Sequence, residues 1–379
     1  MTYALATIWH ERNRFLPAIL AVAFSAVLIA LQSGLLLGLL SMMSTPVDQS
    51  RADVWITYPG VRSVDLGRGI PEAWSYKLEE QPEVDQVEPC VMGFGLWTVQ
   101  ASTSSPEIRT EVCMLIGTYL DTNSIAVIEP LRRRPDLLDQ LREPGAVVVD
   151  RSELGRLGVK GIGDKAEVMG YTVHIVGVLD GLKSLGGAYV FCSIDTARAL
   201  LRYWPQDTTY LLARCRNPGD AETVATRLKN SPRVNVYTSD DFSIRSRWHW
   251  MTTTKAGLAL AFTAALGLLV GAVVTSQTLY AATTASQREY ATLRAMGIPR
   301  WRLKMSVIAQ SFWVGLAGLI TAAPVTIVLS WVAATIGTRV RLPWIIVLSA
   351  AGITMVMALA SGLLALRSLQ QVDPVHNIR

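Results

Sequence analysis

Four stretches of the chain are predominantly apolar and contain no charged side chain, and each is long enough for a helix to cross a bilayer. They occupy residues 15–47, 256–287, 305–338 and 342–366. A helix needs about 20 apolar residues to cross the hydrocarbon core, and there the backbone must satisfy its hydrogen bonds internally. The pattern therefore predicts four transmembrane helices.

A polar segment of roughly two hundred residues separates the first predicted span from the second. Runs rich in β-branched and aromatic residues predict strands at residues 52–58, 87–100, 146–150, 165–168, 171–178, 188–192, 210–216 and 234–238. Helical patterns lie at residues 71–80, 194–203 and 221–230. We expect an α-helical membrane protein with four transmembrane helices plus a large α+β domain between helices 1 and 2.

Within residues 44–250, the elements suggest two βαβ-type lobes that come from the two sequence ends of the domain. An insertion at about 120–187 separates them, with turns at Gly161–Gly163 and Gly186–Gly187. The remaining segments follow in order: an interfacial helix (1–14), span 1 (15–43), span 2 with a helical stalk (251–287), a loop (288–304), span 3 (305–337), span 4 (343–366) and a tail (367–379).

Charge placement predicts the orientation of the chain. The net charge is +5, but residues 48–255 hold 24 Lys+Arg and 27 Asp+Glu, so the other 11 basic and 3 acidic residues carry +8. Nine of these basic residues lie at the termini and in the loop between spans 2 and 3. The other two, Arg339 and Arg341, lie between spans 3 and 4, on the opposite side. The positive-inside rule places both termini in the cytoplasm and the α+β domain outside. No basic face for nucleic acid remains.

The spans also lack His, so they offer no ionisable group of the kind that ion-coupled carriers keep near the midplane. Two Gly-x-x-x-Gly pairs, Gly34/Gly38 and Gly267/Gly271, have the spacing that lets helices approach closely. We expect a homodimer packed through them, although the motif also arises often by chance. Three tryptophans near the outer ends of spans are expected to be interfacial anchors: Trp248, Trp250 and Trp344.

All four cysteines lie in the polar segment, at Cys90, Cys113, Cys192 and Cys215. An oxidising compartment permits disulfides. Cys90–Cys113 across a long hairpin and Cys192–Cys215 across adjacent strands are two possible pairings; the alternative is four buried thiols. The spacing of Cys and His predicts no metal site, and no nucleophile–base set predicts a catalytic one.

The loop after span 2 reads as a short amphipathic helix. Its apolar patch consists of Tyr290, Leu293, Ala295 and Met296, and Arg288, Glu289 and Arg294 surround it. Gly297 suits a left-handed C-cap, with Pro299 beyond it. The alternative is a plain basic loop at the membrane surface.

This loop, with Arg302 beyond it, closely resembles the R-E-x-A/G-x-L-R-A-x-G-x-x-R loop of FtsX-like (MacB-type) ABC transporter permeases. The stretch 155–178 resembles the LGV…GD…VvGV segment of that family, with His174 and an inserted Gly161–Ile162 as departures, and 372–375 resembles its DPxxxLR ending. The chain is most similar to stand-alone permeases of the DevC type.

The resemblance implies a function. The loop would be the coupling helix seated on an ABC ATPase, formed by Arg288, Glu289, Tyr290, Leu293, Arg294, Ala295, Met296, Gly297 and Arg302. ATP and magnesium would bind two copies of that partner, because this chain has no Gly-x-x-x-x-Gly-Lys-Ser/Thr phosphate loop and needs no cofactor of its own.

The resemblance further implies a non-catalytic exporter subunit in a bacterial inner membrane, in contact with membrane lipid. A periplasmic adaptor and an outer-membrane channel would be its further partners, and the cargo would be a lipid, glycolipid, peptide or toxic compound. Two alternatives stay open: a signalling subunit that controls an extracytoplasmic hydrolase, and a permease that releases lipoproteins.

Overall fold

The structure is a computed structural model that describes residues 12–100, 108–184, 186–229, 233–253, 255–285, 299–335, 340 and 342–371. The chain divides into two compact units. Met1–Gly38 and Lys255–Arg379 form a helical unit, and Leu39–Thr254 forms an α+β domain.

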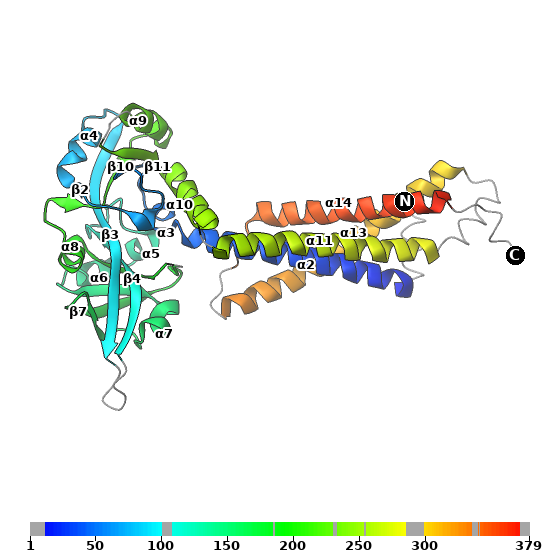
Figure 1. The fold of residues 1–379 in the computed structure, drawn as a ribbon, viewed down its shortest axis with the longest axis horizontal. Coiled ribbons are helices and arrows are strands. Elements are labelled where there is room, and N and C mark those ends of the chain that lie inside the picture. Colours follow the sequence, from blue (N-terminus) through cyan, green and yellow to red (C-terminus); the bar gives the residue numbers. More distant parts are fainter. Residues whose placement is uncertain are drawn as a thin grey trace. The chain divides into compact units, whose positions relative to one another are not determined.

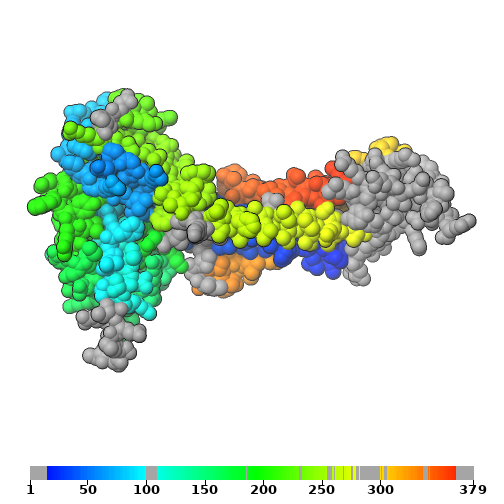
Figure 2. Space-filling model, in the orientation of Figure 1, coloured from blue at the N-terminus to red at the C-terminus, as the bar shows by residue number. Residues whose placement is uncertain are grey.

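The helical unit contains the four predicted spans. Its long helices are α2 (Arg12–Met42), α11 (Lys255–Ala285), α13 (Arg300–Thr335) and α14 (Trp344–Gln371). Each includes a segment long and apolar enough to cross a bilayer, namely Phe15–Met42, Ala261–Thr278, Met305–Thr335 and Trp344–Leu363. Figure 2 shows the four helices packed together, with α2 in blue and α14 in red. The protein is a multi-pass membrane protein.

Small residues let these helices approach one another. Ala18 and Val22 of α2 pack with Val314 of α13 and Ala358 of α14 in one buried cluster. Many of the described large side chains are exposed instead; Phe262, for example, is 67% exposed. This inverted pattern suits a lipid solvent, in which apolar side chains gain little from leaving the surface.

The α+β domain is built on one nine-stranded sheet. Its strand order is β11-β1-β10-β3-β4-β8-β5-β7-β6. The strands are β1 (Val54–Thr57), β3 (Val84–Gln100), β4 (Ile108–Thr118), β5 (Ala146–Asp150), β6 (Lys165–Val168), β7 (Tyr171–Leu179), β8 (Ala188–Ser193), β10 (Tyr210–Cys215) and β11 (Asn235–Thr238). A separate small ladder joins β2 (Ile70–Pro71) to β9 (Asp207–Thr208). In Figure 1, β3 runs the length of the domain.

The sequence predicts two lobes with an insertion between them, and in the structure the strands of that insertion belong to the same sheet as the rest of the domain. β8, which follows the insertion in sequence, pairs with both β4 and β5, so the insertion strands extend the main sheet. β6 then pairs back onto β3, with Trp97 opposite Val168. Strands β3, β4, β8, β5, β7 and β6 thereby form a closed circuit. Trp97 and Leu115 belong to the fully buried cluster that packs within it.

Short helices cover the rest of the sheet. They are α3 (Thr45–Asp48), α4 (Tyr76–Glu79), α5 (Glu129–Arg132), α6 (Pro135–Gln140), α7 (Leu154–Leu157), α8 (Ile194–Leu201), α9 (Ala221–Leu228) and α10 (Ser239–Thr253), with 3₁₀ turns η1 (Val64–Leu66), η2 (Glu72–Ser75), η3 (Arg151–Glu153) and η4 (Pro218–Asp220). The sequence supplies their ends: Ser193 caps α8 by accepting a hydrogen bond from the Thr196 amide. Gly158 ends α7 at φ +71°, a left-handed conformation that favours glycine.

Candidate functional site: the stalk junction

The α+β domain connects to the spans through two chain segments that lie far apart in sequence. α3 begins three residues after the end of α2, and α10 ends two residues before α11 begins. α10 is a helical stalk of the predicted kind, and it begins at Ser239. We call the contacts of α3, α10 and η1 the stalk junction. Its residues are Ser44, Asp48, Asp65, Phe242, Ser243, Arg247 and Trp250.

A charged cluster joins α3 to α10. Asp48 accepts hydrogen bonds from Ser243 Oγ at 2.6 Å, Arg247 Nη2 at 2.5 Å and Ser44 Oγ at 2.8 Å. Arg247 also donates from Nε to Ser44 Oγ at 2.8 Å. Both charged side chains are partly buried, and both carboxylate oxygens accept hydrogen bonds. The two connections to the membrane are thus tied to each other.

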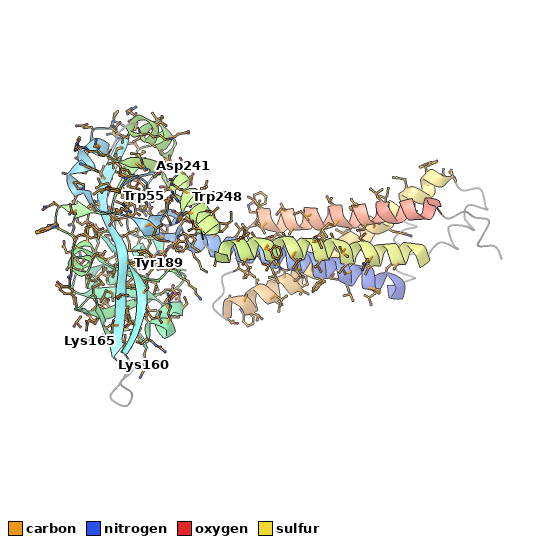
Figure 3. All side chains as sticks on the ribbon, viewed as in Figure 1. Trp55, Lys160, Lys165, Tyr189, Asp241 and Trp248 are labelled. Carbon is orange, nitrogen blue, oxygen red and sulfur yellow. The ribbon has the colours of Figure 1, made fainter. Side chains whose placement is uncertain are left out.

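An aromatic cluster fixes α10 to the sheet. Phe242 is fully buried, and its ring stacks on Tyr237 at 5.5 Å and lies 5.6 Å from Trp55 and 5.8 Å from Tyr210. The Trp55 indole donates to Ser239 Oγ at 3.1 Å. Figure 3 shows Trp55 inside the domain, with Asp241 and Trp248 on α10. Such aromatic packing makes α10 part of the domain core.

The far end of α10 is held by η1. Ser246 Oγ accepts from the Val64 amide at 3.0 Å, and Trp250 Nε1 donates to Asp65 Oδ2 at 2.9 Å. Burial raises the pKa of Asp65 to about 7, and the hydrogen bond from Trp250 partly opposes that rise. The prediction that Trp250 is a membrane anchor is therefore wrong, since its indole binds within the domain. Trp248 and Trp344 are 62% and 71% exposed, as anchors would be.

Sequence reasoning did not single out Asp48, Arg247 or Asp65. Asp48 and Arg247 are 199 residues apart, and no local pattern links positions so distant. One sequence signal could have indicated this pair. Asp48 follows the first span and Arg247 precedes the second, so both lie where the chain passes between a span and the same domain.

Most of the predicted coupling residues fall outside the described part of the chain. They are Arg288, Glu289, Tyr290, Leu293, Arg294, Ala295, Met296 and Gly297. Arg302 is described, in the first turn of α13. Its amide donates to the Pro299 carbonyl at 3.0 Å, and its guanidinium lies 5.5 Å from the centre of the exposed Trp301 ring.

The glycine pairs were predicted to pack between two copies, but Gly267 and Gly271 pack within one chain. A Cβ at Gly267 would lie 2.3 Å from Leu28 Cδ2, and one at Gly271 would lie 3.1 Å from Ser25 Cβ. Ser25 Oγ also donates to the Gly271 carbonyl at 3.2 Å. Gly34 and Gly38 on α2 are likewise buried in the single chain. The spacing correctly indicates a close approach, but the partner of Gly267 and Gly271 is α2.

Both proposed disulfides are also contradicted. All four cysteines are free and buried, and Cys113 pairs with Gly95, five residues along β3 from Cys90. Cys192 and Cys215 belong to different core clusters. Burial raises the pKa of Cys113 to about 12 and that of Cys215 to about 11, so the thiols are protonated. They act as small apolar core residues. Among the described residues, no group of three His, Cys, Asp or Glu side chains is placed to hold a metal.

Comparisons with known proteins identify the family. Residues 15–231 match the model of the MacB-like periplasmic core domain, and residues 261–374 match that of the FtsX-like permease C-terminal region. A comparison with curated protein sequences found no match.

Solved structures resemble about half of the chain at low sequence identity. The periplasmic region of MacB from Actinobacillus actinomycetemcomitans is 14% identical, with a TM-score of 0.34, and the match covers 51% of this chain and 92% of that one. The extracellular domain of the noncanonic ABC-type transporter YknZ from Gram-positive bacteria is 13% identical, with a TM-score of 0.33 and coverage of 48% and 98%. A domain of a putative permease protein from Porphyromonas gingivalis is 14% identical, with a TM-score of 0.30 and coverage of 50% and 90%.

The two family matches cover the first span, most of the α+β domain and the three later spans in their predicted order. The chain belongs to the FtsX-like, MacB-type family of ABC transporter permeases, the membrane subunits of ABC systems.

Proposed function

We propose that this permease subunit transmits the motion of a separate ABC ATPase to an extracytoplasmic α+β domain, where cargo is handled for export. The stalk junction is the observation that carries the proposal. Asp48 and Arg247 join the two connections to the membrane, and Phe242 sets one of them in the domain core. A displacement of either span would therefore reach the sheet directly.

The spans support this division of labour. Their described segments contain no Asp, Glu, Lys, Arg or His, so they offer no charged path for a polar cargo. The α+β domain would then bind and move the cargo. A periplasmic adaptor and an outer-membrane channel would be its further partners. The subunit would lie in a bacterial inner membrane, with both termini in the cytoplasm.

A homodimer remains part of the proposal, but on a different face. Leu258, Phe262, Leu266, Leu269 and Val273 of α11 are all exposed. At about 100° per residue, this stripe lies roughly opposite Gly267 and Gly271, which α2 already covers. The second copy would pack there, and two ATPase subunits would bind the two coupling loops.

The loop between α11 and α13 provides the test of ATPase docking. Leu293→Asp places a charge in the apolar patch that the sequence predicts, and burial of an unpaired charge is costly. Co-purification with the partner ATPase should fall by at least tenfold while membrane insertion persists. Gln287→Asp, which adds the same charge about 120° around the helix from Leu293 and opposite Met296, serves as the control and should retain the partner. Equal co-purification of both variants with the ATPase would refute docking at this loop.

A further inference from the structure

A second feature of the α+β domain is a basic cavity beside α3 and α5. Its volume is about 730 Å³, and its lining residues are Asp48, Gln49, Ser50, Arg51, Glu129, Pro130, Arg132 and Arg133. Three arginines face two carboxylates, which leaves a net charge of +1. Nothing in the proposed coupling mechanism uses Arg51, Arg132 or Arg133.

The carboxylates in the cavity are already engaged. Glu129 accepts from Arg132 Nη1 at 2.7 Å and from Arg133 Nε at 3.0 Å. Asp48 is taken up by Ser44, Ser243 and Arg247 in the stalk junction. Arg51 contributes only its backbone amide, which donates to the Ile125 carbonyl at 2.8 Å. The Arg51 guanidinium has no hydrogen bond or ion pair with the described residues.

Arg132 brings a buried, unpaired donor to the lining of the cavity. Its side chain is only 8% exposed, yet its Nε is buried without a hydrogen-bond partner among the described residues. Nη2 donates to the Val127 carbonyl and Nη1 to Glu129, so the Nε–H is the unsatisfied donor. Buried donors are almost always paired. Burial lowers the pKa of Arg132, and the positive charge of Arg51 lowers it further. An anion bound between Arg51 and Arg132 would compensate the buried charge of Arg132 and offset the repulsion between the two arginines.

Gln49 lies in the same cavity with a second unpaired polar atom, since its Oε1 is buried without a partner among the described residues. Gln49 also lines the cavity, so its side-chain NH₂ joins Arg51 and Arg132 as a donor. Three donors around one cavity suit a tetrahedral oxyanion, and arginine forks suit its geometry.

We propose that this cavity binds a phosphate group, with Arg51 and Arg132 as the charged ligands and Gln49 as the neutral one. The position of the site in the chain favours a phospholipid headgroup as the source. Arg51 lies nine residues beyond Met42, the last residue of α2, and nine residues extend over at most about 30 Å. The site is therefore close in sequence to the end of the first span.

The test uses the full chain in a phosphate-free maltoside detergent. Isothermal titration calorimetry would measure binding of dihexanoyl phosphatidylglycerol, of inorganic phosphate, and of dihexanoylglycerol, which lacks the phosphate. Arg51→Ala should weaken phosphatidylglycerol binding by about tenfold, because one charge-assisted contact is lost, and Arg51→Lys should restore part of it. Arg51 is exposed, so the fold should survive either change.

Arg134→Ala is the matched control. Arg134 follows Arg133, is paired with Asp136, and does not line the cavity. Its loss should leave binding unchanged. Binding of the phospholipid alone identifies a headgroup site, and equal or better binding of inorganic phosphate identifies a site for a free anion. The proposal is overturned if no phosphate compound binds, if dihexanoylglycerol binds as well as phosphatidylglycerol, or if Arg51→Ala and Arg134→Ala bind alike.

Discussion

Replacing Phe242 with alanine should destabilise the α+β domain by about 3–5 kcal/mol, the usual cost of truncating a buried aromatic ring. The ring is fully buried and touches Trp55, Tyr210 and Tyr237, so its loss leaves a cavity between α10 and the sheet. A domain is stable by only about 5–15 kcal/mol. Such a loss would remove a large share of that stability.

Urea unfolding of the full chain in detergent, followed by tryptophan fluorescence, measures this effect, since Trp55 lies 5.6 Å from the removed ring. Ile244→Ala is the control on the same helix. Ile244 is 62% exposed, and exposed substitutions usually change stability by no more than about 0.5 kcal/mol. Equal costs for the two variants would show that α10 is not anchored through Phe242.

Gly318→Leu should disrupt the helical unit. A Cβ at Gly318 would lie 2.6 Å from Val22 Cγ1 and 3.2 Å from the Ala23 backbone nitrogen, so α2 and α13 would have to move apart. Overpacking of this kind costs about 1–3 kcal/mol, occasionally more. Thermal unfolding of the detergent-solubilised chain should show a lower midpoint temperature.

The control for that change is Gly352→Leu on α14. A Cβ at Gly352 meets nothing within 4 Å, so its side chain would extend into lipid or detergent. Its midpoint should stay close to that of the parent chain. If the two leucine variants unfolded at the same temperature, close contact between α2 and α13 would not hold the unit together.

Local elements of the α+β domain could be predicted from sequence. β5 and β6 begin and end at the predicted residues, and β7 extends one residue beyond its predicted end. The β3–β4 hairpin was also visible, with Gln100 opposite Ile108. Period-two patterns and turn residues carry this information, because side-chain alternation and backbone turns are properties of neighbouring residues.

Pairings between distant residues could not be predicted. Nothing in the local pattern of β6 indicates that Val168 pairs with Trp97 of β3, so the sequence alone did not show that the insertion joins the main sheet. The glycine spacing indicated close helix contact but could not distinguish α2 of the same chain from a second copy. The Asp48–Arg247 contact could not be predicted either, because in the sequence each of the two residues looks like an ordinary surface charge.

The central claim is that ATPase motion reaches the α+β domain through the stalk junction, and hydrogen exchange measured by mass spectrometry tests it most directly. The permease would be combined with its partner ATPase, made unable to hydrolyse ATP, and exchange compared with and without ATP. We expect ATP to change exchange in α3, α10 and the adjoining strands β1 and β10. Arg247→Ala should suppress that change. Arg227→Ala should not, because Arg227 pairs with Glu83 away from the junction. ATP-dependent changes confined to the spans and the coupling loop, or unaffected by Arg247→Ala, would contradict the account.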